Sequence, residues 1–298
     1  RISPPKPSSA ASDVYKRQLH THSSISDGTD SPTRLVMRAA GAGLDVISLT
    51  DHDTFDGLEE AHAAGGRFGV KVLPGIEITC REKDVDVHLL GYGCHPDDAQ
   101  LGAELERTRA SRLGRLHRIC QKLTDLDMPL TVEEVMRYAG TAHSLGRPHV
   151  ADAMIAKGYV KDRDEAFATW LSHDCPAYVR RYSIDLADAI TLVRQAKGVA
   201  VLAHPWARGA DRVLSPERIA GLAADGLEGI EVDHNEHGVQ VRRMLFDLGG
   251  RLGLIRTGSS DYHGTGKKGH ELGCNTTRET AYREICTRVQ LRGGHLMW

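Results

Sequence analysis

Short apolar runs alternate with amphipathic segments along most of this chain. Runs such as residues 45–49 (DVISL) and 198–205 (GVAVLAHP) are nearly continuous in Val, Ile, Leu and Ala, which is typical of parallel strands buried on both faces. Intervening segments such as 31–43 (SPTRLVMRAAGAG) and 185–198 begin near Ser, Asp or Pro and end at Gly, as helix capping predicts. About seven strand-like runs in strand–helix alternation indicate an α/β fold and favour a β/α barrel over an open sheet.

The alternation stops between residues 97 and 183, where the pattern predicts helices only. Residues 101–125 form a charged amphipathic helix pattern, and 131–140 (TVEEVMRYAG) opens with a capping box. We therefore predict a barrel in two parts, residues 19–96 and 184–298, with a C-terminal helix closing the second part. The segment 97–183 is interpreted as a helical insertion that serves as a lid or substrate-binding domain.

The first 18 residues, RISPPKPSSAASDVYKRQ, are rich in Pro, Ser and Ala and do not begin with Met. We interpret them as a disordered or foreign leader, although residues 14–19 (VYKRQL) could form an imperfect first strand. They lack the apolar core of a signal peptide.

Composition excludes several classes of protein. A net charge of -2 over 298 residues argues against a protein that binds duplex nucleic acid nonspecifically, which would carry a strongly basic face. Six cysteines without a C-x-x-C pair suggest reduced thiols and a cytoplasmic location rather than a disulfide framework. No run approaches the roughly 18 apolar residues of a membrane span, and no phosphate loop, dinucleotide fingerprint or nucleophile elbow is visible.

Titratable residues gather where the predicted strands end. In residues 19–29 (LHTHSSISDGT), His20 and His22 are two positions apart, so on a strand they point to the same face, and Asp27 can return from the loop that follows. Because the carboxyl ends of barrel strands carry the active site, side chains at the other strand ends should meet there. These are His52, Glu77, His88, His204, Asp261 and His263.

These residues and their spacing resemble the PHP (polymerase and histidinol phosphatase) family. The matching stretches are LHTHSSISDGT, LTDHDT, LPGIEIT, VHLLGYG, AHP and GSSDYHG, in the family's order between Leu19 and Thr277. The similarity is greatest to stand-alone phosphoesterases that resemble nucleoside bisphosphate phosphatases and an RNA 5′-end exonuclease, which have an insertion with a GRPH segment, here residues 146–149. One departure is Gln18, where the family usually has an acidic residue.

The resemblance implies a distorted seven-stranded barrel that holds two or three divalent metals. It assigns His20, His22, Glu77 and Asp261 to one metal and Asp27, His52 and His263 to a second. Glu77 would also reach a third, with His88 and His204. Six imidazoles and three carboxylates without thiolate suit Mn best, with Fe or Zn as alternatives. Metals clustered in this way would lower the pKa of a shared water and supply hydroxide, so Glu77, Asp261 and His263 are the candidate catalytic residues.

Substrate contacts are expected from four further residues. Arg147 offers a forked donor to phosphate, and His149, Arg180 and His234 lie near it or beyond a strand end. Each has an alternative interpretation: a helix start for Arg147 and His149, and a solvated charge pair for Arg180 with Arg181.

The remaining titratable residues near these motifs are less specific. His237 shares the interpretation of His234 as a substrate contact or a proton relay. Asp51 either orients a ligand imidazole or caps a helix, and Asp53 is expected to be a cap or solvent-facing. Seven histidines are assigned no role: His62, His95, His117, His143, His173, His270 and His295.

The sequence thus predicts a metal-dependent phosphoesterase acting on nucleotide phosphomonoesters, for example removing the 3′-phosphate of a nucleoside 3′,5′-bisphosphate. The alternatives are 5′-3′ exonucleolytic trimming of short single-stranded RNA, hydrolysis of a cyclic phosphodiester, and a non-catalytic accessory module. No membrane and no obligate protein partner are expected.

Overall fold

The computed structural model describes residues 15–140, 142 and 144–297. The predicted leader lies outside this range up to residue 14. Its last residues do not behave as a leader, because Arg17 and Gln18 begin the first strand and are buried. Gln18 donates a hydrogen bond from Nε2 to Ser260 Oγ over 2.7 Å, so this position anchors the strand to the loop that carries Asp261.

The strands form a nearly closed barrel, which confirms the predicted α/β barrel class. They follow the order β1-β2-β3-β4-β6-β7-β8, and β5 pairs with the far end of β3. Closure comes from the loop after β8, where Tyr262 O accepts a hydrogen bond from His22 N over 2.8 Å. The strands are β1 (Arg17–Thr21), β2 (Val46–Leu49), β3 (Lys71–Glu82), β4 (Val85–Tyr92), β5 (Ile184–Asp185), β6 (Val199–Leu202), β7 (Gly229–Asp233) and β8 (Ile255–Gly258).

The predicted regular alternation of strand and helix is wrong at one place. β4 follows β3 directly as a hairpin and runs antiparallel to both β3 and β6. The two strands are long and pair from Gly75–Tyr92 to Glu82–Val85. A hairpin needs no crossover helix, and the apolar pattern of a buried strand does not reveal its direction. The hairpin places Glu77 on β3 and His88 on β4 close to one another.

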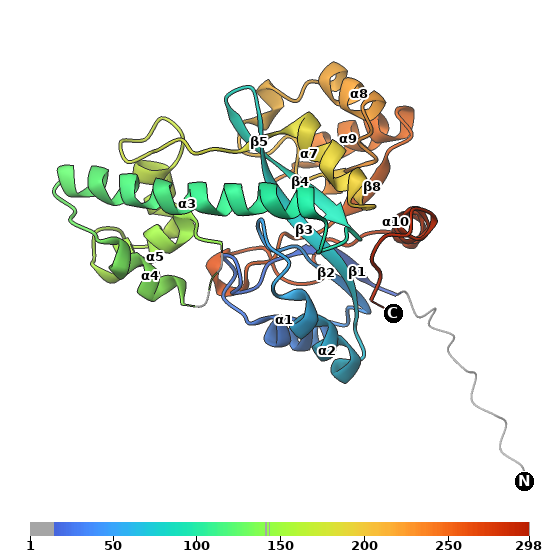
Figure 1. The fold of residues 1–298 in the computed structure, drawn as a ribbon, viewed down its shortest axis with the longest axis horizontal. Helices are drawn as coiled ribbons and strands as arrows, with labels where there is room; N and C mark the ends of the chain where they lie inside the picture. The colour runs from blue at the N-terminus through green and yellow to red at the C-terminus, as the bar shows by residue number, and fades with distance from the viewer. Residues whose placement is uncertain (1–14, 141, 143, 298) are drawn as a thin grey trace, which may run out of the picture.

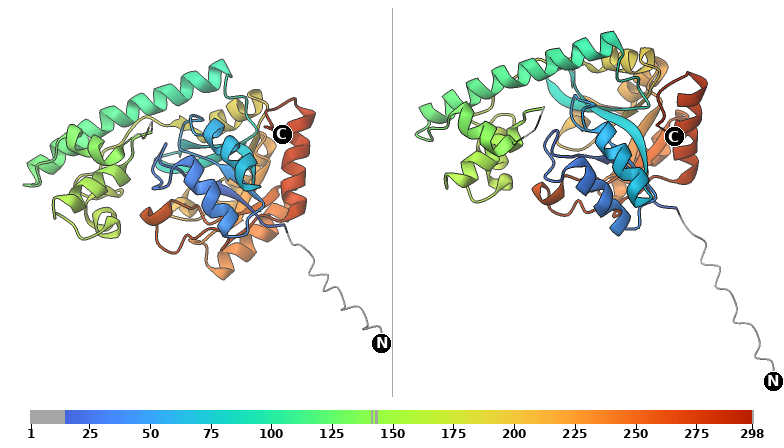
Figure 2. Two further views of the ribbon diagram at one scale, coloured as in Figure 1. Left: turned by 90° about the horizontal axis from the view of Figure 1, so that it is seen from below. Right: turned by 60° about the horizontal axis from the view of Figure 1, so that its bottom comes forward.

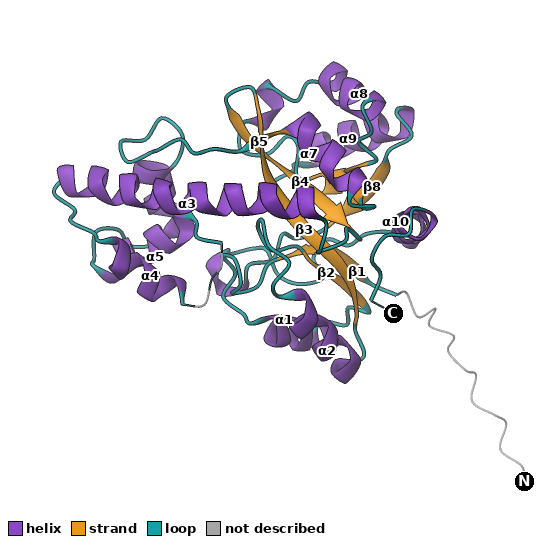
Figure 3. Cartoon of the chain, viewed as in Figure 1, coloured by secondary structure: helices purple, strands orange, loops and turns teal. Residues whose placement is uncertain are grey.

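Helices cover the outside of the barrel (Figure 3). Their starts follow the predicted capping chemistry: Ser31 Oγ accepts from Arg34 N, and Ser215 Oγ accepts from Arg218 N, each with Pro at the first helical position. These helices are α1 (Pro32–Gly41), α2 (Leu58–Phe68), α7 (Leu186–Gln195), α8 (Pro216–Ala224), α9 (Val239–Arg251) and α10 (Glu279–Leu291), with short turns η2 (Ala210–Arg212) and η3 (Gly264–Gly266).

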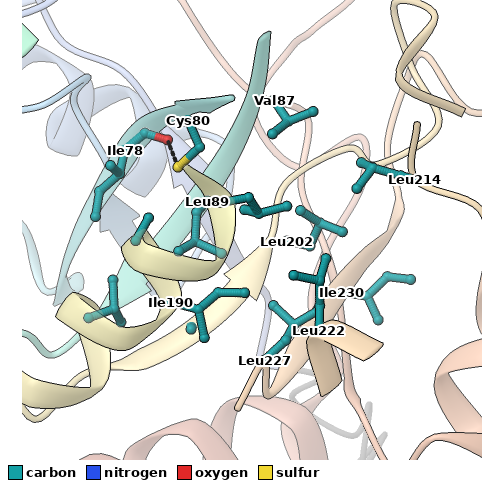
Figure 4. Packing of buried hydrophobic residues seen from close by; sticks show 14 of the residues in the cluster. Ile78, Cys80, Val87, Leu89, Ile190, Leu202, Leu214, Leu222, Leu227 and Ile230 are labelled. Atoms are coloured by element: carbon teal, nitrogen blue, oxygen red, sulfur yellow. Dashed lines mark hydrogen bonds between the residues drawn. The ribbon is translucent and has the colours of Figure 1, made fainter. Parts of the chain in front are cut away.

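The largest hydrophobic core lies between the sheet and helices α7 to α9. Strand residues Leu89, Leu202 and Ile230 pack against Ile190 of α7 and Leu222 of α8 (Figure 4). All five side chains are fully buried, and each contributes roughly 1.5–3 kcal/mol by leaving water. This core fixes the strand ends that carry the site.

The segment between β4 and β5 forms a helical lobe beside the barrel (Figures 1 and 2). The long helix α3 runs from the barrel to the far end of the lobe, and the other helices pack beneath it. The lobe has its own buried cluster, which includes Leu123, Val135, Met154 and Leu171. Its elements are α3 (Ala99–Asp125), α4 (Val132–Ala139), α5 (Arg147–Ala156), α6 (Arg163–Ala166) and the π-helix η1 (Phe167–Leu171).

A buried ion pair joins α3 to the barrel and corrects the prediction for Asp53. This residue is fully buried rather than solvent-facing. Its Oδ2 accepts from Arg112 Nε at 2.9 Å and Nη2 at 2.5 Å, and its Oδ1 accepts from Thr79 N. Burial alone would raise the pKa of Asp53, but Arg112 and Arg181 lower it below its usual value. The insertion is therefore attached to the barrel beside the candidate site.

Candidate metal centre

His20 and His22 leave β1 on the same face, as their spacing predicts. Their Nε2 atoms lie 3.1 Å apart, and both face Glu77 Oε2, at 3.3 and 3.1 Å, and Asp261 Oδ1, at 3.2 Å each. All four side chains are buried. Burial opposes a charged imidazole, yet the carboxylates of Glu77 and Asp261 raise the pKa of His20 well above its usual value. Four donor atoms, two imidazole nitrogens and two carboxylate oxygens, thus converge on one point.

A second group of donors lies on the other side of His22. Asp27 Oδ1 is 3.2 Å from His263 Nε2, and its Oδ2 is 3.8 Å from His52 Nε2. Asp27, His52, His263 and His22 offer donor atoms within 4.8 Å of one another. Burial favours the neutral acid, but His263 and His52 hold the pKa of Asp27 well below its usual range.

Glu77 lies at the centre of a third group. Its Oε1 is 2.8 Å from His88 Nδ1 and 3.3 Å from His204 Nε2, while its Oε2 is 3.2 Å from His52 Nδ1. The tight group consists of His52, Glu77 and His88, so His204 faces the same carboxylate from slightly farther out. Burial and Arg208 lower the pKa of His204 to about 3, which leaves it in the neutral form that binds metals.

The backbone reaches this geometry at a conformational cost. His204, Arg208 and Asp261 all have positive φ, at 23°, 56° and 55°, a region that residues other than glycine seldom adopt. Such strain clusters at functional sites, where the surrounding structure holds it in place. Here the strained residues lie on the loops after β6 and β8, and two of them point a predicted metal ligand into the site.

The two carboxylate oxygens of Asp261 have different surroundings. Its Oδ1 is buried and has no hydrogen-bond partner among the described residues. Its Oδ2 is 2.7 Å from Lys267 Nζ and 3.2 Å from Arg208 Nη2, and both cations also contact Glu236. Lys267, Arg208 and Glu236 were missed because each lies just beyond the stretch that was considered, after GSSDYHG, AHP and GIEVDHN respectively. Together they fix the orientation of Asp261 and place two cations beside it.

Glu231 on β7 also escaped prediction, although it lies in the strand-like run GIEVDHN. It is buried, and its Oε1 is 3.3 Å from His20 Nδ1, while its Oε2 accepts from His204 N over 3.0 Å. Burial would raise the pKa of Glu231, but His20 lowers it to about 2. A carboxylate on Nδ1 fixes the tautomer of His20 and leaves Nε2 free for a metal.

This contact leads to a prediction about metal affinity. The substitution Glu231→Gln should weaken divalent metal binding about 10- to 100-fold, because the carboxylate no longer orients His20. Isothermal titration with Mn²⁺ measures the change. Glu217→Gln on the exposed face of α8 is the matched control. Equal affinity in both variants would show that Glu231 does not support the ligand.

Asp51 contacts the loop that follows β1. Its carboxylate accepts hydrogen bonds from Ser23 N, Ser23 Oγ and Ser26 Oγ, at 2.6 to 2.8 Å. Ser26 Oγ also lies 3.4 Å from His22 Nδ1. Asp51 therefore braces the loop that carries His22 and Asp27 instead of capping a helix.

A fourth group extends the site behind Asp261. His234, Asp261 and His270 offer donor atoms within 4.8 Å, and His234 Nε2 lies 3.6 Å from Asp261 Oδ2. His234 Nδ1 accepts from Glu236 N, so its Nε2 carries the proton and faces the carboxylate. His270 was assigned no role, yet it is buried here and contacts Ser260 O through Nδ1. His237 is buried and Nδ1 contacts Val232 O.

The donor set fits divalent metal ions. Buried His52 Nδ1, His88 Nδ1 and Asp261 Oδ1 have no hydrogen-bond partner among the described residues, and such atoms are costly unless a ligand satisfies them. Imidazole nitrogens and carboxylate oxygens are the ligands that Mn, Fe and Zn share. Several buried clusters of this kind are what a metal-dependent phosphoesterase requires.

A cavity of about 750 Å³ opens above these donors, between the barrel and the insertion. Predicted metal ligands, including Glu77, His88 and Asp261, form one part of its wall. Arg147, Phe167 and Tyr178 of the insertion form another. This volume is typical of a small-molecule site.

The four predicted substrate residues are placed differently. Arg147 lines the cavity, where its Nη1 donates to Leu171 O and its guanidinium lies over the Phe167 ring. His149 is buried beneath it, and its Nδ1 accepts from Gly146 N. His234 lies behind Asp261. Arg180 is exposed, lies outside the cavity lining and donates to Lys83 O, so the structure gives no support to a substrate contact there.

Several known proteins are similar to this chain in sequence and fold. Residues 18–163 match the model of the PHP domain. A 3′,5′-nucleoside bisphosphate phosphatase of Chromobacterium violaceum is 33% identical over 274 residues, which cover 92% of this chain and 96% of that protein. This chain belongs to the PHP family. A crystal structure from Bifidobacterium adolescentis, described as a metal-dependent phosphoesterase, is 36% identical to this chain and has a TM-score of 0.87. The match covers 92% of this chain and 96% of that chain.

Other PHP relatives carry different activities in their names. A 5′-3′ exoribonuclease of Haemophilus influenzae is 30% identical and covers 83% of this chain and 90% of its own. A phosphoribosyl 1,2-cyclic phosphate 1,2-diphosphodiesterase of Eggerthella lenta is 32% identical, and the match covers 83% of this chain and 93% of that protein. The chain is therefore a PHP phosphoesterase, a metal-dependent hydrolase of phosphoric esters. Within the described residues, no helix is long and apolar enough to cross a membrane.

Proposed function

We propose that this PHP phosphoesterase removes a phosphate monoester from a nucleotide, with a nucleoside 3′,5′-bisphosphate as the preferred substrate. The observation that carries the proposal is the cavity, which joins the metal donors to cationic and aromatic side chains within about 750 Å³. A single nucleotide fits such a volume. The bisphosphate phosphatase of Chromobacterium violaceum, at 33% identity over nearly the full length, supports the same choice.

The metal ligands follow the three groups of donors. His20, His22, Glu77 and Asp261 would hold one ion, and Asp27, His52 and His263 a second. Glu77 would reach a third ion with His88 and His204. Bound divalent ions supply Lewis-acid stabilisation of the phosphate and a water of lowered pKa. Mn is the metal we favour, because the set mixes imidazoles with carboxylates and contains no thiolate.

The chain's own residues position the substrate. Arg208 Nη2 and Lys267 Nζ reach Asp261 Oδ2 at the cavity wall, where they place positive charge beside the metal donors. We assign the reacting phosphate to this end. Phe167 and Tyr178 offer aromatic surface for a base at the insertion end. Helices of the insertion cover the cavity on that side and limit the access of water.

A second candidate function is 5′-3′ exonucleolytic trimming of short RNA. It is favoured by the relative of that name in Haemophilus influenzae. Hydrolysis of a cyclic phosphodiester has equal support from the relative in Eggerthella lenta. All three reactions use the same metal chemistry, so they differ in what the cavity admits beside the reacting phosphate.

Phosphate and nucleotide release from a substrate panel tests the proposal. Purified protein with Mn²⁺, or separately with Zn²⁺, is given adenosine 3′,5′-bisphosphate, adenosine 3′-monophosphate, a 1,2-cyclic ribose phosphate and a 5′-phosphorylated RNA trimer. We expect the highest kcat/KM for the bisphosphate with Mn²⁺, by about tenfold or more, because it carries a second phosphate that the 3′-monophosphate and the cyclic ester lack, and is smaller than the RNA trimer. A higher kcat/KM for the RNA or the cyclic ester would replace the proposal by that activity.

A further inference from the structure

Three arginines near the insertion end of the cavity pair with no carboxylate among the described residues, and one of them, Arg147, lines the cavity. Arg115 lies on α3, Arg147 is the first residue of α5, and Arg181 precedes β5. None has an ion-pair partner within 4 Å among the described residues, whereas the neighbouring Arg112 and Arg163 are paired with Asp53 and Asp152. Cations without partners inside a protein are rare, because their removal from water is costly unless a counter-charge is present.

Arg115 has the least compensation of the three. It is 94% buried, since 6% of its surface is exposed, and its Nε and Nη2 have no hydrogen-bond partner among the described residues. Burial, Arg147 and Arg181 lower the pKa of Arg115 to about 8. Arg181 is also buried, and its Nε is likewise without a partner. An anion placed among these groups would remove an electrostatic penalty that the fold otherwise bears.

Access to the group runs through Arg147 and Tyr178, which both line the cavity. The guanidinium carbons of Arg115 and Arg147 lie 5.5 and 5.8 Å from the centroid of the Tyr178 ring. A small hollow, lined by Arg112, Arg115 and Arg147, adjoins the cavity. The π-helix η1 contributes as well, because Leu171 O at its end accepts from Arg147 Nη1 over 3.0 Å, which holds this guanidinium at the wall.

Strand β4 connects this group of arginines to the metal donors. Asp86 lies on β4, two residues before His88 on the same strand. Burial would raise the pKa of Asp86, but Arg181, Arg147 and Arg115 lower it. Side chains two positions apart on a strand point to the same face and are separated by about 6.6 Å. A ribose separates the two phosphates of a nucleoside 3′,5′-bisphosphate by a comparable span. Asp86 cancels only one of three positive charges.

We propose that Arg115, Arg147 and Arg181 form a binding subsite for the phosphate that is not cleaved, so that the enzyme selects substrates with a second phosphate group. This inference rests on the proposed function for its substrate. Arg147 contacts the anion, and Arg115 and Arg181 add charge from behind it. Binding by the subsite itself can be measured without turnover.

The test compares adenosine 5′-monophosphate with adenosine in equilibrium binding to wild type, Arg115→Met and Arg181→Met. Wild type should bind the monophosphate about 10- to 100-fold more tightly than adenosine, as expected for hydrogen bonds to a charged group. Each variant should lose most of that preference and keep its affinity for adenosine. Arg118→Met is the matched control, because Arg118 lies one turn along α3, is exposed and bonds only backbone oxygens.

Each outcome decides one of the two proposals. A monophosphate preference that persists in both variants would overturn the subsite. The same holds if wild type shows no preference at all. If the preference depends on Arg115 or Arg181 but adenosine 3′,5′-bisphosphate is not hydrolysed, the subsite stands and the proposed function fails.

Thermal unfolding provides a second readout that does not depend on nucleotide binding. Removal of a buried, unpartnered charge should leave the Tm of Arg115→Met equal to that of wild type or higher. A Tm well below that of wild type would show that Arg115 supports the fold, and would overturn its role as an unpaired cation.

Discussion

Replacing Glu77 by Gln is expected to reduce phosphate release at least about a thousandfold. Glu77 faces five imidazoles at 2.8 to 3.3 Å through its two oxygens, those of His20, His22, His52, His88 and His204. Burial alone would raise its pKa, but His88, His20 and His52 hold it well below the usual range, so the carboxylate is charged. A neutral amide keeps only one, weaker oxygen donor and lacks the negative charge, so it should hold metal poorly. The loss of Lewis-acid stabilisation is worth several kcal/mol, at 1.36 kcal/mol for each factor of ten.

The measurement is initial-rate phosphate release with saturating Mn²⁺, together with the metal content of each purified protein. Glu59→Gln on α2 removes an exposed carboxylate of the same type and should leave both quantities unchanged. A Glu77→Gln variant with wild-type activity would remove the shared-ligand arrangement from the mechanism. Retention of activity with fewer bound ions would instead show that one of the three donor groups is dispensable.

Arg112→Ala should lower the free energy of unfolding by about 3–5 kcal/mol, because it leaves the buried carboxylate of Asp53 without its counter-charge. Urea unfolding followed by circular dichroism gives this quantity. Arg283→Ala is the control, since Arg283 belongs to an exposed pair with Glu279 on α10 and should have little effect. A loss as small as that of the control would show that the attachment of α3 does not depend on this ion pair.

The ion pair of Asp53 with Arg112 also makes the stability of the protein depend on pH. The pKa of Asp53 in the folded protein is below the ordinary value of 3.8, so the folded state binds its proton less readily than the unfolded state does. Its contribution is fully present above the unfolded pKa and is lost as the pH falls through the folded pKa. The difference in unfolding free energy between wild type and Arg112→Ala should therefore be constant near pH 6 and diminish below about pH 4.

The sequence was sufficient to predict the barrel and which residues gather at one end of it. His20 and His22 could be placed on one face because strand geometry repeats every two residues. Glu77, His204 and Asp261 could be placed beside them because strand ends share one rim in a barrel. The roles of these residues as ligands remain a prediction, which the adjacency of their donor atoms supports.

Features that depend on tertiary contacts could not be read from the chain. Glu231 is an ordinary strand residue until the barrel closes, with β8 between β7 and β1, and its side chain meets that of His20. Asp53 follows a strand and precedes a helix, a position where solvent-facing caps are common, and only the arrival of Arg112 from α3 makes it a buried partner. The antiparallel direction of β4 was hidden because buried strands of either direction have the same apolar composition.

The helical lobe between β4 and β5 has a hydrophobic cluster of its own, apart from those of the barrel, while all nine predicted metal ligands come from the barrel. Replacement of the lobe's lining residues therefore leaves the hydrolytic chemistry intact and changes what is admitted to it. A scaffold divided in this way allows bisphosphate, cyclic ester and RNA specificities to diverge among relatives without rebuilding the centre that cleaves the bond.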